Sequence, residues 1–244
     1  GPKNLGTHRP QVPLGPRPDG RILRYYDTQP TTIGFHSLTD LGDVNGDGIA
    51  DFATATRFSS HFTDSRVTAR DGNTGLVLWS RYLGRQAGSV QISGGHDLNR
   101  DGRPDVFVLT PRFLVNGVTF GFSHAGDTIF TGYYTGQYKV SRPQRPSEAS
   151  AVGDLNNDRV TDFIISGWDT THSSTCAVLV SGSNGAVLRA DYGPGSRSSG
   201  QSVAGIGDLD RDGVRDYTVD SIEGVWVGSG RTGKRIHFWP DPIA

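Results

Sequence analysis

The chain has 244 residues, of which 34% are hydrophobic, and it contains 34 Gly and 13 Pro. Its formal net charge is −1, so it lacks the strongly basic balance that is typical of nucleic-acid-binding proteins. No apolar segment approaches the roughly 18 residues that a spanning helix needs, so we expect no membrane span in this chain. A composition this rich in turn-forming residues is typical of many short β-strands.

The first predicted element is a strand at residues 19–27, within an N-terminal extension that covers residues 1–31. Its sequence is similar to residues 185–192, which we expect to form the outer strand of a later repeat. It either pairs with the last repeat or belongs to a preceding one, and both alternatives stay open. Gly1-Pro2 resembles a tag-cleavage scar, so we expect that a native leader has been removed.

Four similar repeats follow the extension. Each begins with a short segment of small and apolar residues, continues through an acidic run into a β-rich segment, and ends with two strands joined by a glycine turn. No segment has a convincing helical period. Four strands in about 55 residues predict one antiparallel blade of a β-propeller. We place the blades at residues 32–83, 87–135, 147–192 and 200–240.

The predicted fold class is therefore all-β, a β-propeller of four-stranded blades with four blades visible. These blades form either a closed four-blade ring or an arc of a larger ring. A β-sandwich is the alternative, but a sandwich would not repeat one acidic loop four times at equal spacing. Residues 134–146 form the one long insertion between blades. They carry three basic residues, and we expect them to be a specific contact surface.

Two motifs within the blades are assigned to structure. Residues 228–234 nearly match a phosphate-binding loop, but Arg235 stands where Ser or Thr is needed. The segment aligns with the glycine turns of other blades, so we predict a hairpin turn there. The single cysteine, Cys176, excludes an intrachain disulfide and is expected to be a small buried residue.

The acidic runs share the pattern D-x-[ND]-x-D-[GR]-x-x-D. They begin at Asp43, Asp97, Asp154 and Asp208, with spacings of 54, 57 and 54 residues. Together they hold 13 of the 25 acidic residues of the chain. Negative charge packed this densely is costly unless a cation compensates it.

We predict that each run binds Ca²⁺, up to four ions in all. Calcium accepts six to eight oxygen ligands, which positions 1, 3, 5 and 9 supply from side chains and position 7 supplies from its carbonyl. Glycine at position 6 permits the left-handed backbone of such a loop. Strands follow the runs and no Glu stands at position 12, which excludes an EF-hand, and the crowded carboxylates suit Ca²⁺ better than Mg²⁺. The predicted ligands are Asp43, Asn45, Asp47, Ile49 and Asp51; Asp97, Asn99, Asp101, Arg103 and Asp105; Asp154, Asn156, Asp158, Val160 and Asp162; and Asp208, Asp210, Asp212, Val214 and Asp216.

The four loops are expected to differ in affinity. Arg159 replaces the glycine at position 6 of the third loop, which predicts backbone strain and the weakest binding. The fourth loop carries four aspartates, which predicts the tightest binding if the loop geometries are equal.

The repeats resemble FG-GAP repeats, the units of the integrin α-subunit propeller and of many secreted bacterial proteins. Residues 200–216 carry the best match. The resemblance implies calcium in the loop between the first two strands of each blade, at one face of the propeller. Integrin propellers have seven blades, so four blades also suggest a fragment or a homodimer that completes a larger ring.

We expect no enzymatic activity. There is no G-x-S-x-G motif, and the seven histidines form no H-x-x-x-H pair; His96 adjoins a loop but is expected to have a packing role. The expected function is a secreted or cell-surface module, extracellular or periplasmic, that binds a protein or glycan ligand at one propeller face. The alternative is a lectin-like module or a non-catalytic part of a polysaccharide-active enzyme. The aromatic residues mostly predict inter-blade packing, with sugar stacking as the alternative: Trp79, Trp168, Trp226, Trp239, Tyr82, Tyr133 and Tyr134.

Overall fold

The structure is a computed structural model that contains strands and no helix in the part of the chain it describes. No candidate for a membrane-crossing helix is therefore present among these residues. The predicted strand at 19–27 lies outside them, as does the 134–146 insertion apart from residues 134, 138 and 139. The described residues are 32–58, 64–85, 90–110, 117–134, 138–139, 148–172, 174–192, 202–221 and 223–240.

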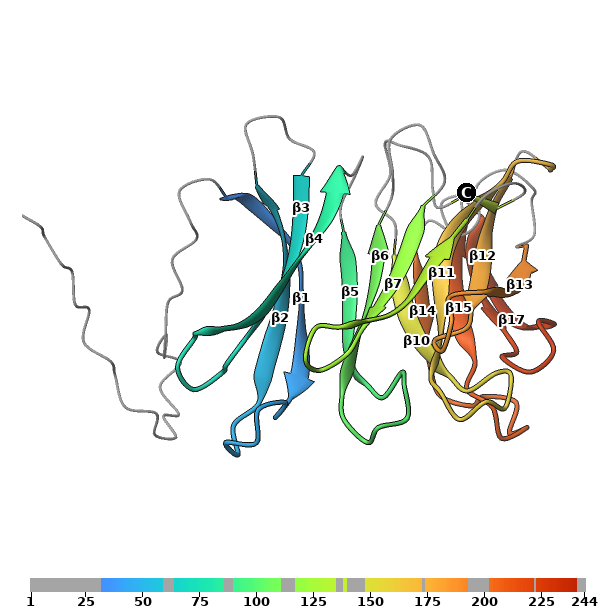
Figure 1. Cartoon of the computed structure of the whole chain (residues 1–244). Coiled ribbons are helices and arrows are strands. Elements are labelled where there is room, and N and C mark those ends of the chain that lie inside the picture. The colour runs from blue at the N-terminus through green and yellow to red at the C-terminus, as the bar shows by residue number, and fades with distance from the viewer. Residues whose placement is uncertain are drawn as a thin grey trace, which may run out of the picture.

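The strands form four antiparallel sheets in chain order (Figure 1), so the predicted all-β fold of four-stranded blades is confirmed. A short extra strand, β9, pairs with β11 at the margin of the third sheet. The first sheet holds β1 (Thr32–Gly42), β2 (Asp51–Phe58), β3 (Asp64–Arg70) and β4 (Val77–Arg85); the second holds β5 (Gln91–His96), β6 (Asp105–Thr110), β7 (Val118–Phe122) and β8 (Thr128–Tyr133); the third holds β9 (Tyr138–Lys139), β10 (Ala149–Gly153), β11 (Asp162–Asp169), β12 (Ser174–Val180) and β13 (Val187–Asp191); the fourth holds β14 (Val203–Gly205), β15 (Tyr217–Ser221), β16 (Gly224–Gly228) and β17 (Arg235–Pro240).

The second sheet is covered on both faces, which explains why the sequence of β6 is almost entirely apolar. Every residue of this strand is buried. Val106 and Val108 belong to a core shared with the first sheet, whereas Phe107 and Leu109 belong to a core shared with the third. Alternate side chains of a strand point to opposite faces, so a continuous apolar run identifies a strand between two layers.

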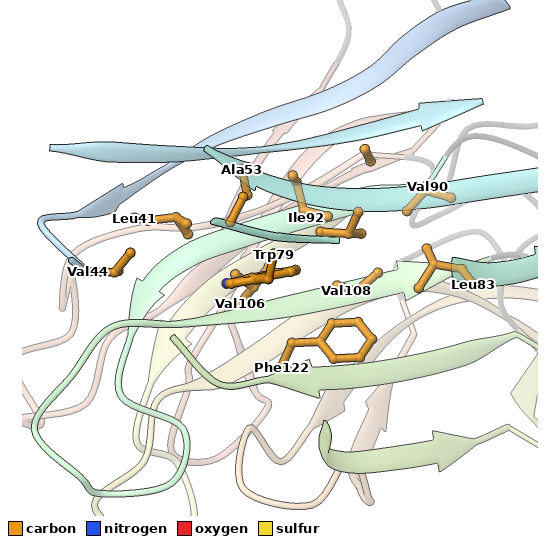
Figure 2. Close-up of a cluster of buried hydrophobic side chains, with 13 residues drawn as sticks. Leu41, Val44, Ala53, Trp79, Leu83, Val90, Ile92, Val106, Val108 and Phe122 are labelled. Atoms are coloured by element: carbon orange, nitrogen blue, oxygen red, sulfur yellow. The ribbon is translucent and has the colours of Figure 1, made fainter. Parts of the chain in front are cut away.

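Three buried clusters join successive sheets. The first packs Trp79 among aliphatic residues of the first two sheets (Figure 2). The second stacks Phe107 on Phe163 with ring centroids 3.9 Å apart. The third sets Tyr217 edge-on to Trp226 beside residues of the third sheet. None of these three clusters of described residues contains residues of both the first and the fourth sheets.

The first strands of neighbouring sheets approach one another closely, and glycine permits this approach. A Cβ atom on Gly205 would lie 1.9 Å from the Ala151 carbonyl oxygen, and one on Gly94 would lie 2.4 Å from that of Asp40. The Gly205 N–H instead donates to Ser150 Oγ at 3.0 Å. Adjacent sheets are therefore held by polar contacts between their first strands as well as by the apolar clusters.

Some of the aromatic residues pack between sheets, as mostly expected, and others are exposed, as the sugar-stacking alternative requires. Trp79, Trp226 and Tyr134 are buried between sheets, whereas Tyr82, Tyr133 and Trp239 are exposed on the outer strands β4, β8 and β17. Cys176 is a buried free cysteine in the second cluster, as predicted, and burial raises the pKa of its thiol to about 12. Residues 228–234 form the predicted hairpin turn, in which the Gly233 N–H donates to the Ser229 carbonyl.

Candidate metal centres

Each acidic run connects the first two strands of its sheet. The runs lie in the β1–β2, β5–β6, β10–β11 and β14–β15 connections, and each ends on the first residue of a strand or just before it. This agrees with the loop position that the FG-GAP resemblance implies. In each antiparallel sheet, the turn between the third and fourth strands lies at the same end as the acidic run (Figure 1).

The loop backbone is left-handed at two positions. Position 6 has positive φ in every loop, including Arg159 at 64°, as expected. Position 4 is also left-handed: Gly46 has φ 84°, and the equivalent Arg100, Asn157 and Arg211 have φ 66°, 62° and 62°. Sequence reasoning missed position 4 because three of its four residues are not glycine. The third loop is the one with non-glycine residues at both positions, which adds strain.

The first aspartate of each run closes its loop by accepting main-chain hydrogen bonds. Asp43 Oδ1 accepts from the Gly46 N–H at 2.7 Å, and Oδ2 accepts from the Gly48 N–H at 2.7 Å. The bond from Gly48 holds the pKa of Asp43 below its usual value. Asp43 Oδ1 also accepts from the Asp47 N–H, at position 5, at 3.1 Å. Asp97, Asp154 and Asp208 accept the bonds from positions 5 and 6 in the same way.

The last aspartate of each run is buried, and both of its oxygens accept main-chain hydrogen bonds. Asp51 Oδ2 accepts from the Val44 N–H at 3.0 Å, within the loop. Its Oδ1 accepts from the Gly72 N–H at 2.9 Å, in the turn between the third and fourth strands. The equivalent donors are Leu98 and His124 for Asp105, Leu155 and Gly182 for Asp162, and Leu209 and Gly230 for Asp216.

Burial of these carboxylates carries an electrostatic cost. Loss of hydration raises the pKa of Asp162 to about 6 and also raises the pKa of Asp105. Two main-chain N–H donors offset part of that cost for each residue. The negative charges of positions 1 and 5 add to it, since Asp154 and Asp158 both act to raise the pKa of Asp162.

The middle positions are oriented by the same kind of hydrogen bond. Asn45 Oδ1 accepts from the Asp47 N–H at 2.9 Å, and Asp47 Oδ1 accepts from the Ile49 N–H at 2.9 Å. The other three loops repeat both bonds. The four loops thus share one hydrogen-bonded conformation, whatever residues occupy their variable positions.

Two groups of potential metal-ligand atoms emerge among the described residues. Asp208, Asp210 and Asp216 bring ligand atoms within 4.8 Å of one another, and so do Asp101, Asp105 and His124. These acidic clusters could hold metal ions. The fourth-loop set is entirely carboxylate oxygen, which fits a hard cation such as Ca²⁺. The remaining predicted ligands, including the four carbonyls at position 7, stay predictions.

His124 is the residue that sequence reasoning missed. The His124 N–H donates to Asp105 Oδ1 at 2.8 Å. His124 is therefore the second-blade equivalent of the turn glycines Gly72, Gly182 and Gly230. A Cβ on those glycines would lie within 2 Å of a loop carbonyl. The signal in the sequence is the turn Ser123-His124-Ala125-Gly126, which is one residue shorter than its counterparts.

His96 has the packing role that we expected. Its ring lies edge-on to Phe163 with centroids 5.2 Å apart, and its Nε2 lies 3.0 Å from Ser93 Oγ. Burial lowers the pKa of His96, and the positive charge of Arg215 lowers it further.

Comparison with known proteins identifies no family for this chain. No protein-family model matches the chain, and none of the curated protein sequences matches it. Among solved structures, the crystal structure of the V. cholerae biofilm matrix protein Bap1 is similar, with 14% sequence identity and a TM-score of 0.41. The match covers 84% of this chain and 38% of the Bap1 chain.

Proposed function

We propose that this chain is a calcium-binding β-propeller module of the FG-GAP type, which acts outside the cell as a binding or adhesion module. The observation that supports it is the recurrence of one loop conformation in four sheets, each with a buried aspartate bonded to the same two main-chain positions. A loop that recurs in all four sheets in this way would both stabilise the fold and bind the cation. The resemblance of the sequence to FG-GAP repeats supports the extracellular location.

The proposed ligands are the side chains at positions 1, 3, 5 and 9 and the carbonyl at position 7. When bound, the cation would supply positive charge that offsets repulsion among carboxylates. The residues of the chain supply the rest. Position 9 ties the loop to the neighbouring turn, and position 1 holds the loop backbone in its left-handed conformation.

The proposed activity is binding without catalysis. A protein or glycan ligand would contact one face of the propeller, where loops from successive blades lie close together. A homodimer that completes a larger ring remains part of this proposal.

Carbohydrate binding is the second candidate, and one observation favours it. Tyr82, Tyr133 and Trp239 expose 59%, 64% and 49% of their surface on the outer strands. Exposed aromatic rings provide flat apolar faces on which sugar rings stack. Loss of binding on a glycan array after alanine substitution of these residues would support the candidate, and unchanged array signals would remove it.

Metal removal tests the main proposal. Metal content after dialysis against Ca²⁺ should approach four ions per chain, and EDTA should lower the melting temperature by several degrees. Mg²⁺ at the same concentration should restore less of the loss, because Mg²⁺ demands six ligands at shorter distances. An identical melting temperature in Ca²⁺ and EDTA would contradict the proposal.

A further inference from the structure

A side chain from the turn between the third and fourth strands faces the acidic loop in every blade. In each case it approaches Oδ2 of the aspartate at position 5, whose Oδ1 accepts the main-chain bond from position 7. The four contacts are Asn73 Nδ2 to Asp47 at 3.3 Å, His124 Nδ1 to Asp101 at 3.4 Å, Ser183 Oγ to Asp158 at 2.7 Å, and Arg231 Nε to Asp212 at 3.3 Å.

These four partners differ in charge. Asn73 and Ser183 are neutral and donate ordinary hydrogen bonds. His124 is charged only when protonated. Arg231 is permanently positive, so among these four turn residues it alone is a fixed cation. In the third loop a fixed cation reaches the fifth-position carboxylate from another acidic loop, since Arg100 Nη2 lies 4.0 Å from Asp158 Oδ1.

Arg231 is held against the fourth loop at two points. Besides the ion pair with the Asp212 carboxylate, its Nη2 donates to the Asp212 carbonyl oxygen at 2.6 Å. The Asp212 side chain is 23% exposed and the Arg231 side chain 55% exposed. The three carboxylates that gather in this loop are those of Asp208, Asp210 and Asp216, and Asp212 is not among them.

We propose that Arg231 is a built-in counter-charge that sets the cation affinity of the fourth loop. It competes with a divalent cation for Asp212, so this loop binds Ca²⁺ more weakly than its four aspartates predict. This inference rests on the proposed calcium function. The turn residue thereby becomes a determinant of affinity in each blade, outside the nine-residue loop motif.

The expected effect is moderate because the guanidinium is half exposed. Repulsion between Arg231 and an incoming cation is screened by water and salt, and the side chain is free to swing outward at the cost of its ion pair. Replacing Arg231 by a neutral residue should tighten Ca²⁺ binding at the fourth loop by about three- to fivefold.

The test compares R231Q with K234Q by calcium titration of the full chain against a chromophoric chelator. Lys234 lies in the same turn and is exposed, so K234Q removes the same charge without touching Asp212. R231Q should tighten one site, and K234Q should leave all sites within about twofold of the wild type. R231K, which keeps the charge, should remain closer to the wild type than R231Q does.

A double variant assigns the effect to the fourth loop. D208N weakens that loop, so the gain from R231Q should disappear in D208N/R231Q. Equal affinities for R231Q and wild type, or equal gains in R231Q and K234Q, would overturn the inference. Absence of calcium binding at every loop would instead defeat the proposed function. Melting curves in EDTA check that each variant is folded before its titration is interpreted.

Discussion

The Oδ1 atom of Asp216 accepts a hydrogen bond from the main-chain N–H of Gly230 at 3.0 Å, across 14 residues of sequence. Its Oδ2 atom accepts from the Leu209 N–H, so one carboxylate joins the acidic loop to the β16–β17 turn. The same pair of bonds recurs in the other three blades. A predicted calcium ligand is therefore also a structural tie of its sheet.

Asp216 should stabilise the protein even when no cation is bound. In D216N one of the two N–H donors would face an amide N–H₂ group, and the loss of that bond should cost about 1–3 kcal/mol of unfolding free energy. Urea unfolding in EDTA measures it. D208N is the matched control, because Asp208 is exposed and water replaces its lost bonds. Equal losses in the two variants would contradict the structural role of position 9.

Replacing Arg159 by glycine should stabilise the protein and strengthen calcium binding at the third loop. It has φ 64°, and its N–H donates to Asp154 Oδ2, a bond that glycine keeps. R159G should raise the unfolding free energy by about 0.5–1 kcal/mol and tighten calcium binding at the third loop. The reciprocal G48R, where an added Cβ meets nothing within 4 Å, should lose a similar amount. A loss of stability in R159G, or a gain of stability in G48R, measured by calorimetry would refute the strain argument.

Gly205 and Gly207 should respond differently to alanine. A Cβ at Gly205 would lie 1.9 Å from the Ala151 carbonyl oxygen, so G205A must push two blades apart. We expect G205A to cost about 2 kcal/mol or more of unfolding free energy. A Cβ at Gly207 meets nothing within 4 Å, and its φ is not in the left-handed region, so G207A should be neutral within about 0.5 kcal/mol. Similar melting temperatures for both variants would count against the close inter-blade approach.

His96 should make the protein less stable in acid. Its pKa is lowered in the folded state by burial, so the unfolded chain takes up a proton at higher pH than the folded chain does. The stability that neutral His96 contributes is present above the unfolded pKa of about 6.5 and is lost as pH falls through the lower folded pKa. H96Q should flatten this part of the pH dependence, measured by urea unfolding in EDTA. A ring proton of His96 that titrates at 6.5 or above in NMR would contradict the prediction.

The four blades could be predicted from the sequence because their motifs repeat. The spacing of Asp43, Asp97, Asp154 and Asp208 identified four units, and alternation around glycine turns identified their strands. The left-handed φ of Arg159 also followed from its place at a glycine position. Position 4 could not be predicted, because Arg100, Asn157 and Arg211 carry no local signal for a left-handed backbone, and the hydrogen bonds of the whole loop impose it.

The sequence alone determined the all-β class, the four units and the place of the acidic loops, because these depend on local period and on the spacing of the acidic runs. The tertiary structure decided which groups from other segments meet each loop. The main chain of Gly230 meets Asp216, and the side chains of His124 and Arg231 meet Asp101 and Asp212. Such contacts form because the hairpin of the third and fourth strands of each sheet packs against the acidic loop. This long-range geometry is not encoded by the spacing of residues within the nine-residue motif.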